Sequence, residues 1–184
     1  MIEIRWHGRG GQGAFTASRL LAASASLYQG MYALAFPSFG PERRGAPVQA
    51  FTKIDEKKIT DRSEIVSPDY IVILDDTLAY DGIAGDIKDN GQVIINTSRP
   101  EKYAHRQQDQ GSCIVAFDAT ALALQVLKKP ITNTAMLGAL IAVSGIISLE
   151  SAVKGMQAVM GRSILAGNIE LLKRAYEQNR VILR

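Results

Sequence analysis

The sequence predicts an α/β fold: a three-layer α/β/α sandwich around a mostly parallel mixed sheet, with a helical C-terminal third. The main observation is that short β-rich segments alternate with helical segments through the first two-thirds of the 184 residues, after which only helical periodicity follows. The composition, with 47% hydrophobic and 21% charged residues, is typical of a globular protein. The length and the absence of linker-like segments predict one domain over residues 1–184.

The N-terminal part is predicted as a strand, a helix and two further strands. Residues 2–6 form a β-rich segment that leads straight into a glycine-rich turn. Residues 14–27 carry apolar side chains every three or four positions, which is typical of a helix, and Gly30 can close it. Strands at 32–36 and 48–54 follow with no helix between them, so one strand of the sheet is expected to run antiparallel.

Between those strands, residues 37–47 cannot form regular structure, because three prolines and two glycines interrupt them. This stiff stretch carries Glu42, Arg43 and Arg44 next to aromatic residues. Arginine pairs bidentately with carboxylate or phosphate, which favours a ligand or partner contact over an idle solvated loop.

Three buried strands and a helical region make up the remainder. The strands are predicted at 71–74, 93–95 and 114–117. Helices are predicted from Ala119 onward, with breaks near Pro130, around Ser148 and at Gly161–Arg162. Acidic residues follow two of these strands, and each is expected to cap the next helix as readily as to line a site: Asp75, Asp76 and Asp118.

The uncharged stretch 131–149 is about as long as a membrane crossing. Its Thr, Asn, Ser and Gly content favours instead a helix buried in a core or subunit interface, with no membrane contact. Gly138, Ala142 and Gly145 would lie along one face of that helix, where small residues let another backbone pack closely.

The glycine-rich segment after the first strand is the first candidate site, and it has two interpretations. Its spacing matches a dinucleotide-binding turn, where glycines and a helix N-terminus accept a phosphate. The turn can equally serve close packing against the sheet or a partner subunit. A Rossmann-type oxidoreductase also needs an acidic residue near positions 36–38, and the nearest is Glu42. The candidate residues are Gly8, Arg9, Gly10, Gly11, Gln12 and Gly13.

Composition narrows the chemistry that this chain can hold. A single cysteine, Cys113, cannot ligate an iron–sulfur cluster or close an internal disulfide. The chain has only two histidines, His7 and His105, so we also expect no metal site built from protein ligands. His7 and Cys113 are expected to be structural, His7 as a hydrogen-bonded residue and Cys113 as a small buried one. The net charge of +3 is scattered, so no nucleic-acid binding is expected. The N-terminal residues do not match a secretory signal, which favours a cytoplasmic protein.

Three segments in order carry a resemblance to a known family: GRGGQGAFTASRLL, AFPSFGPERRGAPVQAFTKID and SPDYIVILDDTL. Together with the later NTAMLGAL they resemble the gamma subunit of the 2-oxoacid:ferredoxin oxidoreductases. The run from Glu42 to Val48 is most similar to the pyruvate or ketoisovalerate type. The resemblance covers nearly the whole chain, and it is more specific than a glycine pattern alone.

The resemblance implies a reaction: oxidative decarboxylation of a 2-oxoacid with coenzyme A to an acyl-CoA, carbon dioxide and reduced ferredoxin. It implies that thiamine diphosphate, Mg²⁺ and iron–sulfur clusters lie on other subunits, namely thiamine-binding alpha and beta subunits and a ferredoxin-like delta subunit. This chain would have no catalytic residue and would be inactive alone, with a homodimer of the isolated chain left open. Its glycine turn, with Arg43 and Arg44, would contact coenzyme A phosphate or another subunit. The alternative is a free-standing Rossmann-type nucleotide-dependent oxidoreductase.

Overall fold

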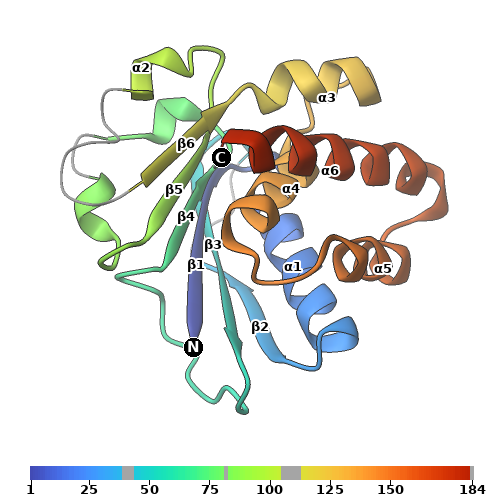
Figure 1. Cartoon of the computed structure of the whole chain (residues 1–184). Coiled ribbons are helices and arrows are strands. Elements are labelled where there is room, and N and C mark those ends of the chain that lie inside the picture. The colour runs from blue at the N-terminus through green and yellow to red at the C-terminus, as the bar shows by residue number, and fades with distance from the viewer. Residues whose placement is uncertain (39–43, 81–82, 105–112, 183–184) are drawn as a thin grey trace.

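The chain folds around one six-stranded mixed sheet with helices on both faces (Figure 1). The structure is a computed structural model, which describes residues 1–38, 44–80, 83–104 and 113–182. In spatial order across the sheet, the strands are β2 (Tyr32–Pro37), β3 (Pro47–Asp55), β1 (Ile2–Arg9), β4 (Tyr70–Ile73), β5 (Gln92–Asn96) and β6 (Cys113–Phe117).

The sheet is parallel in one half and antiparallel in the other. Strands β1, β4, β5 and β6 are parallel neighbours, whereas β3 is antiparallel to both β1 and β2. The predicted mixed, mostly parallel sheet is therefore confirmed. Every predicted strand is present, and β1 is longer than expected because it continues through Gly8 and Arg9, which pair with Val48 and Pro47.

Helices cover the two faces of the sheet unequally. One face carries a thick layer, visible to the right of the sheet in Figure 1, and the other carries only short elements. The three-layer prediction is confirmed, and the C-terminal helices break where the sequence predicts. The thick layer contains α1 (Ala14–Tyr28), α3 (Ala119–Leu127), α4 (Asn133–Ser144), α5 (Leu149–Val159) and α6 (Arg162–Ile182). The thin layer contains η1 (Asp76–Leu78), η2 (Ile83–Asp86) and α2 (Glu101–Ala104).

Alternation along β1 gives its two faces different chemistry. Ile4 and Trp6 are fully buried under the helices, and the Trp6 indole donates a hydrogen bond to the Thr52 hydroxyl at 3.0 Å. The intervening side chains, Arg5 and His7, point to the opposite face, since neighbouring residues of a strand alternate. The far side of β1 is therefore buried but polar, and this polar surface reaches the carboxyl end of the strand.

Helix α4 lies in the middle of the thick layer, as the prediction of a buried small-residue helix requires. Gly138 packs directly on α6, where a Cβ would stand 2.5 Å from the Leu172 carbonyl oxygen. Gly145, in contrast, is exposed and ends the helix with φ 62°, so the expectation that it shares the packed face is wrong. Within the described ranges, no helix combines the length and apolarity that a membrane crossing needs.

Replacing Gly138 with alanine is expected to destabilise the fold by about 1–2 kcal/mol. The added methyl must displace the α6 backbone, and this overpacking exceeds the gain of about 1 kcal/mol in helix propensity. Urea unfolding measures the change. Gly161→Ala is the matched control, since a Cβ there meets nothing within 4 Å. Equal stability of the two variants would contradict the close α4–α6 packing.

Candidate functional site

The carboxyl end of β1 turns sharply before α1 begins. Gly11 has φ 97° and Gly13 has φ 84°, left-handed conformations that side chains disfavour. Gly13 is also closely packed, because a Cβ there would stand 2.6 Å from the side-chain nitrogen (Nδ2) of Asn133, whereas a Cβ on Gly11 would meet nothing within 4 Å. The glycine turn therefore serves packing at Gly13 and leaves an approachable backbone at Gly11.

The side chains of Arg9 and Gln12 hold this turn together from within. The Arg9 guanidinium donates to the Asp75 carboxylate at 3.0 Å, to the Thr77 hydroxyl at 2.8 Å and to the Gly45 carbonyl at 3.1 Å. Gln12 donates to the same Asp75 oxygen at 3.0 Å and accepts from the Arg9 amide at 2.7 Å. Partial burial raises the pKa of Asp75, but hydrogen bonds from Thr77 and Gln12 outweigh it and keep the pKa below its usual value. Both side chains are thus engaged within the chain.

The segment before β3 lies directly against the glycine turn. The Gly10 amide donates to the Ala46 carbonyl at 2.9 Å, and the Gly45 amide donates to the Gly10 carbonyl at 3.0 Å. The structure therefore brings together the two segments that the sequence singles out. Arg43 lies outside the described residues. Arg44 is exposed and has no ion pair among the residues that the structure describes.

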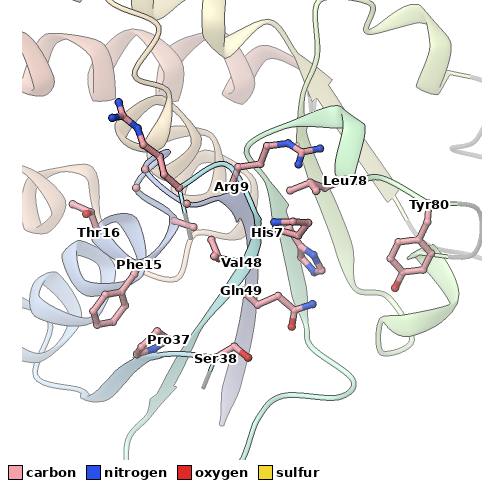
Figure 2. Close-up of a pocket in the computed structure, with 16 residues that line it drawn as sticks. His7, Arg9, Phe15, Thr16, Pro37, Ser38, Val48, Gln49, Leu78 and Tyr80 are labelled. Atoms are coloured by element: carbon pink, nitrogen blue, oxygen red, sulfur yellow. The ribbon is translucent and has the colours of Figure 1, made fainter. Parts of the chain in front are cut away.

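These segments border an open cleft of about 1080 Å³. Figure 2 shows Phe15 and Thr16, at the start of α1, on one side, and His7 and Gln49 on the sheet face turned away from α1. Leu78 and Tyr80 border the cleft beyond His7, and Arg44 also lines it. The residues that line the cleft thus fall into two groups on either side of the end of β1, which we call the helix lobe (Phe15, Thr16) and the sheet lobe (His7, Gln49, Tyr80).

The helix lobe favours an anion. Helix α1 begins after Gly13, which has no side chain to cap it, and its first turn contains no acidic residue. The backbone N–H groups of a first helical turn are left without helical partners, and together with the helix dipole they attract negative charge. With the exposed Arg44 also lining the cleft, this lobe has the polarity that a phosphate group requires.

The sheet lobe contains an unusual histidine. His7 is 7% exposed, and its Nε2 atom is buried with no hydrogen-bond partner among the described residues. The expectation that His7 is a hydrogen-bonded structural residue is therefore wrong for this nitrogen. Burial, reinforced by the nearby Arg5 charge and only partly offset by Asp86, lowers the pKa of His7 to about 4. The ring is neutral at physiological pH.

The other residues that the sequence analysis weighed have structural roles. Asp75 caps η1 by accepting from the Thr77 amide, and Asp118 caps α3 by accepting from the Ala121 amide at 2.7 Å. Asp76 accepts from the Thr97 hydroxyl at 2.6 Å. Cys113 is only half-buried at the start of β6, where it packs against the edge of the core, so the expectation that it is buried is met only in part. Across the described part of the chain, no three His, Cys, Asp or Glu side chains gather as a metal site would require.

Sequence reasoning missed most of the sheet lobe. Gln49 pairs with His7 across β1 and β3, and this pairing follows from the antiparallel register once Pro47 is placed opposite Arg9. Tyr80 reaches the cleft from the chain beyond η1, and no local sequence signal marks it. Phe15 and Thr16 could have been found from their position in the first turn of the predicted helix.

Comparison with known proteins identifies the same relatives from sequence and from structure. The family model described as pyruvate ferredoxin/flavodoxin oxidoreductase matches residues 3–178. The chain is 46% identical to pyruvate synthase subunit PorC of Methanocaldococcus jannaschii, covering 97% of both chains. It is 44% identical to the pyruvate/ketoisovalerate oxidoreductases common subunit gamma of Pyrococcus furiosus, covering 98% of both. The crystal structure of pyruvate oxidoreductase subunit PORC from Thermotoga maritima matches with a TM-score of 0.81 and 38% identity, covering 96% of this chain and 95% of that one.

The lowered pKa of His7 predicts a stability change with pH. The unfolded chain binds a proton at this ring below about pH 6.5, but the folded chain binds it only near pH 4, so stability is lost as the pH falls between these values. From about pH 7.5 to about pH 5 the loss is about 2 kcal/mol. Urea unfolding of the wild type and His7→Gln at both pH values measures it. The variant keeps every other titrating group, and an unchanged pH dependence in it would contradict the assignment.

Proposed function

This chain belongs to the pyruvate ferredoxin/flavodoxin oxidoreductase family, and from that premise we propose that it is the gamma subunit of a pyruvate (2-oxoacid):ferredoxin oxidoreductase complex. The complex decarboxylates a 2-oxoacid oxidatively with coenzyme A, forming an acyl-CoA, carbon dioxide and reduced ferredoxin. The observation that carries the proposal is the end-to-end match with gamma subunits of this enzyme class, at 46% and 44% identity.

The redox chemistry belongs to other subunits in this proposal. A cluster of iron and sulfide needs several thiolates, and the whole chain contains one cysteine. No metal-binding cluster occurs within the residues that the structure covers. Thiamine diphosphate with Mg²⁺ is assigned to alpha and beta subunits, and the iron–sulfur clusters to those and a ferredoxin-like delta subunit. Only the assembled complex would pass electrons to ferredoxin.

The contribution of this chain is to hold coenzyme A where the acyl group is delivered. Supporting this, the helix lobe combines an uncapped helix start with the exposed Arg44 and the open backbone of Gly11. Arg9 and Gln12 contribute indirectly, because their side chains fix the turn and the Arg44–Pro47 segment against each other. Arg43 is included in the proposed contact on the sequence argument alone.

A free-standing nucleotide-dependent oxidoreductase is not favoured. In a Rossmann unit the second strand lies parallel beside the first and ends in an acid that binds the ribose. Here β1 has the antiparallel β3 as its neighbour on that side, and β2 is displaced to the sheet edge. The resemblance to a dinucleotide-binding site is therefore limited to the glycine spacing.

Replacing Arg44 with alanine in the assembled complex is expected to raise KM for coenzyme A about tenfold with little change in KM for the oxoacid. Removing a charge-assisted contact to phosphate costs about 1.5–3 kcal/mol when the contact is well formed, and exposure reduces this. Steady-state kinetics on Arg44→Ala and on Arg43→Ala measure the effect. Arg162→Ala is the matched control, because Arg162 is exposed at the start of α6 and does not line the cleft.

The two roles considered for Arg43 and Arg44, a contact with coenzyme A phosphate and a contact with another subunit, predict different results. Intact assembly, judged by co-purification of all subunits, with an unchanged KM for coenzyme A would contradict the proposed phosphate contact. Loss of assembly in Arg44→Ala would instead assign the residue to the subunit interface.

A further inference from the structure

Strand β2 forms one edge of the sheet, so one side of its backbone has no neighbouring strand (Figure 1). The Ser38 amide donates to the Gln49 carbonyl at 2.9 Å, and in an antiparallel ladder every second residue bonds to the neighbouring strand in this way. Ala33 and Ala35 lie between these bonded positions, so their N–H and C=O groups point away from the sheet. No backbone group of the described residues outside the ladder bonds to them. The free edge of β2 therefore offers two donors and two acceptors.

The usual features that prevent an edge strand from pairing with another chain are absent from β2. Sheet edges are commonly protected by charged side chains, bulges or interior prolines. The sequence of β2, YALAFP, contains no charge, its register with β3 is unbroken, and its proline, Pro37, is the last residue. Pro37 has no N–H, and the Met31 amide already donates to the Ala25 carbonyl at 3.2 Å. The free donors of this edge are thus those of Ala33 and Ala35.

We propose that this edge pairs with the same edge of a second copy of the chain, antiparallel about a two-fold axis at Leu34. In this pairing Ala33 lies opposite the partner's Ala35, and Ala35 lies opposite the partner's Ala33. Each of the four free donors of the two edges then meets a free acceptor, and the two sheets become continuous. The inference uses only the geometry of β2 and its surroundings, so it does not depend on the proposed function.

Side chains on one face of β2 favour this register. Ala33 packs against the core under the helices, so alternation directs Tyr32, Leu34 and Phe36 to the opposite face of the sheet. In the proposed pairing Leu34 lies opposite the partner's Leu34, and Tyr32 lies opposite the partner's Phe36. Cross-strand pairs of large apolar side chains stabilise a sheet. All six side chains on this face of the two strands therefore have an apolar partner.

The neighbouring registers pair these side chains less well. A shift of two residues in one direction places Tyr32 opposite the partner's Ser38, and a shift in the other direction places Phe36 opposite the partner's Gly30. A shift of one residue is excluded, because it brings the free groups of one edge against the bonded positions of the other. The axis at Leu34 is therefore the register that the side chains select.

The surface of the edge also has room for the side chain that this register brings to it. A hollow of about 310 Å³ borders β2 and is lined by Tyr32, Leu34 and Ile59, among others. Tyr32 is 51% exposed, although it is a large aromatic residue at the start of a strand. The partner's Phe36 lies beside this hollow in the proposed pairing. An aromatic ring placed there buries apolar surface of both chains.

Charged residues at the two ends of β2 are complementary under the same two-fold symmetry. Lys58 borders the hollow beside Tyr32, whereas Glu64 accepts a hydrogen bond from the Ser38 hydroxyl, just beyond the other end of the strand, at 2.7 Å. Neither Lys58 nor Glu64 has an ion pair with the residues that the structure describes. Antiparallel pairing brings the start of one strand beside the end of the other. Lys58 therefore approaches the partner's Glu64, and the reverse contact forms at the other end.

The first test measures self-association of the full-length chain by sedimentation equilibrium. The wild type is expected to form a dimer of twice 20.0 kDa at micromolar concentrations. Ala35→Pro is expected to weaken the dimer by about tenfold or more, because two-fold symmetry removes two hydrogen bonds at once. Proline is tolerated at an outward-facing position of an edge strand, so the β2–β3 ladder is kept. Ala35→Ser, which keeps the N–H, is the matched control and is expected to dimerise like the wild type.

The second test locates the axis with introduced thiols in a Cys113→Ser background. Facing Cα atoms at a position like that of Leu34, which carries no ladder hydrogen bond, stand about 4.5 Å apart, within the range of a disulfide. Leu34→Cys is therefore expected to form an intermolecular disulfide on mild oxidation. Tyr32→Cys is the control, because its two copies lie four residues apart along the strands, about 13 Å. Random collisions would instead favour Tyr32→Cys, the more exposed position.

Several results would overturn the proposal. One is a wild-type chain that stays monomeric at high micromolar concentrations, and another is equal dimerisation of Ala35→Pro and Ala35→Ser. Disulfide formation through Tyr32→Cys and not through Leu34→Cys contradicts the axis. Protection of the Ala33 and Ala35 amides from hydrogen exchange only after other subunits are added would assign the edge to a different chain. Urea unfolding checks each variant, and if Ala35→Pro misfolds, the two cysteine variants decide the question.

Discussion

The antiparallel placement of β3 beside β1 is the constraint on which the cleft depends. Because the two strands run in opposite directions, Pro47 at the start of β3 pairs with Arg9 at the end of β1. The segment entering β3 therefore meets the glycine turn leaving β1, and backbone hydrogen bonds between Gly10 and Ala46 join them. A parallel β3 would place its starting segment at the opposite edge of the sheet, and the two segments could not meet.

The Arg9 side chain holds the glycine turn and the segment before β3 in a fixed position relative to each other. Its planar guanidinium bonds to groups on both neighbouring segments, Asp75 after β4 and Gly45 before β3. Lysine could not reproduce this, since it offers a point charge rather than a fork of donors. An arginine placed in a glycine-rich turn is easily interpreted as a ligand contact. Here each of its three guanidinium nitrogens donates a hydrogen bond within the chain, whereas Arg44 is exposed at the cleft.

The fold could be predicted in outline because hydrophobic patterning and chain breakers specify it locally. The strands at β4, β5 and β6 are short apolar runs bounded by polar or glycine residues, and the C-terminal helices end where Pro130 and Gly161 interrupt them. The site could be predicted only in part, because it depends on register. Nothing local to His7 distinguishes a bonded from an unbonded ring nitrogen, and Gln49 becomes its neighbour only through the β1–β3 pairing. At Gly145 a local pattern was misleading. Its spacing from Gly138 and Ala142 predicts a packed position, but its left-handed φ shows that it ends the helix.

The chemistry of the sheet lobe suits a subunit that positions a substrate instead of transforming it. A general base works best when its pKa lies near the working pH. His7, with a pKa of about 4, is too weakly basic for that role at neutral pH, but it remains a competent hydrogen-bond partner. Low cysteine content and a neutral histidine both support the proposed function, in which the reactive centres lie on other chains and this one orients the molecule they act upon.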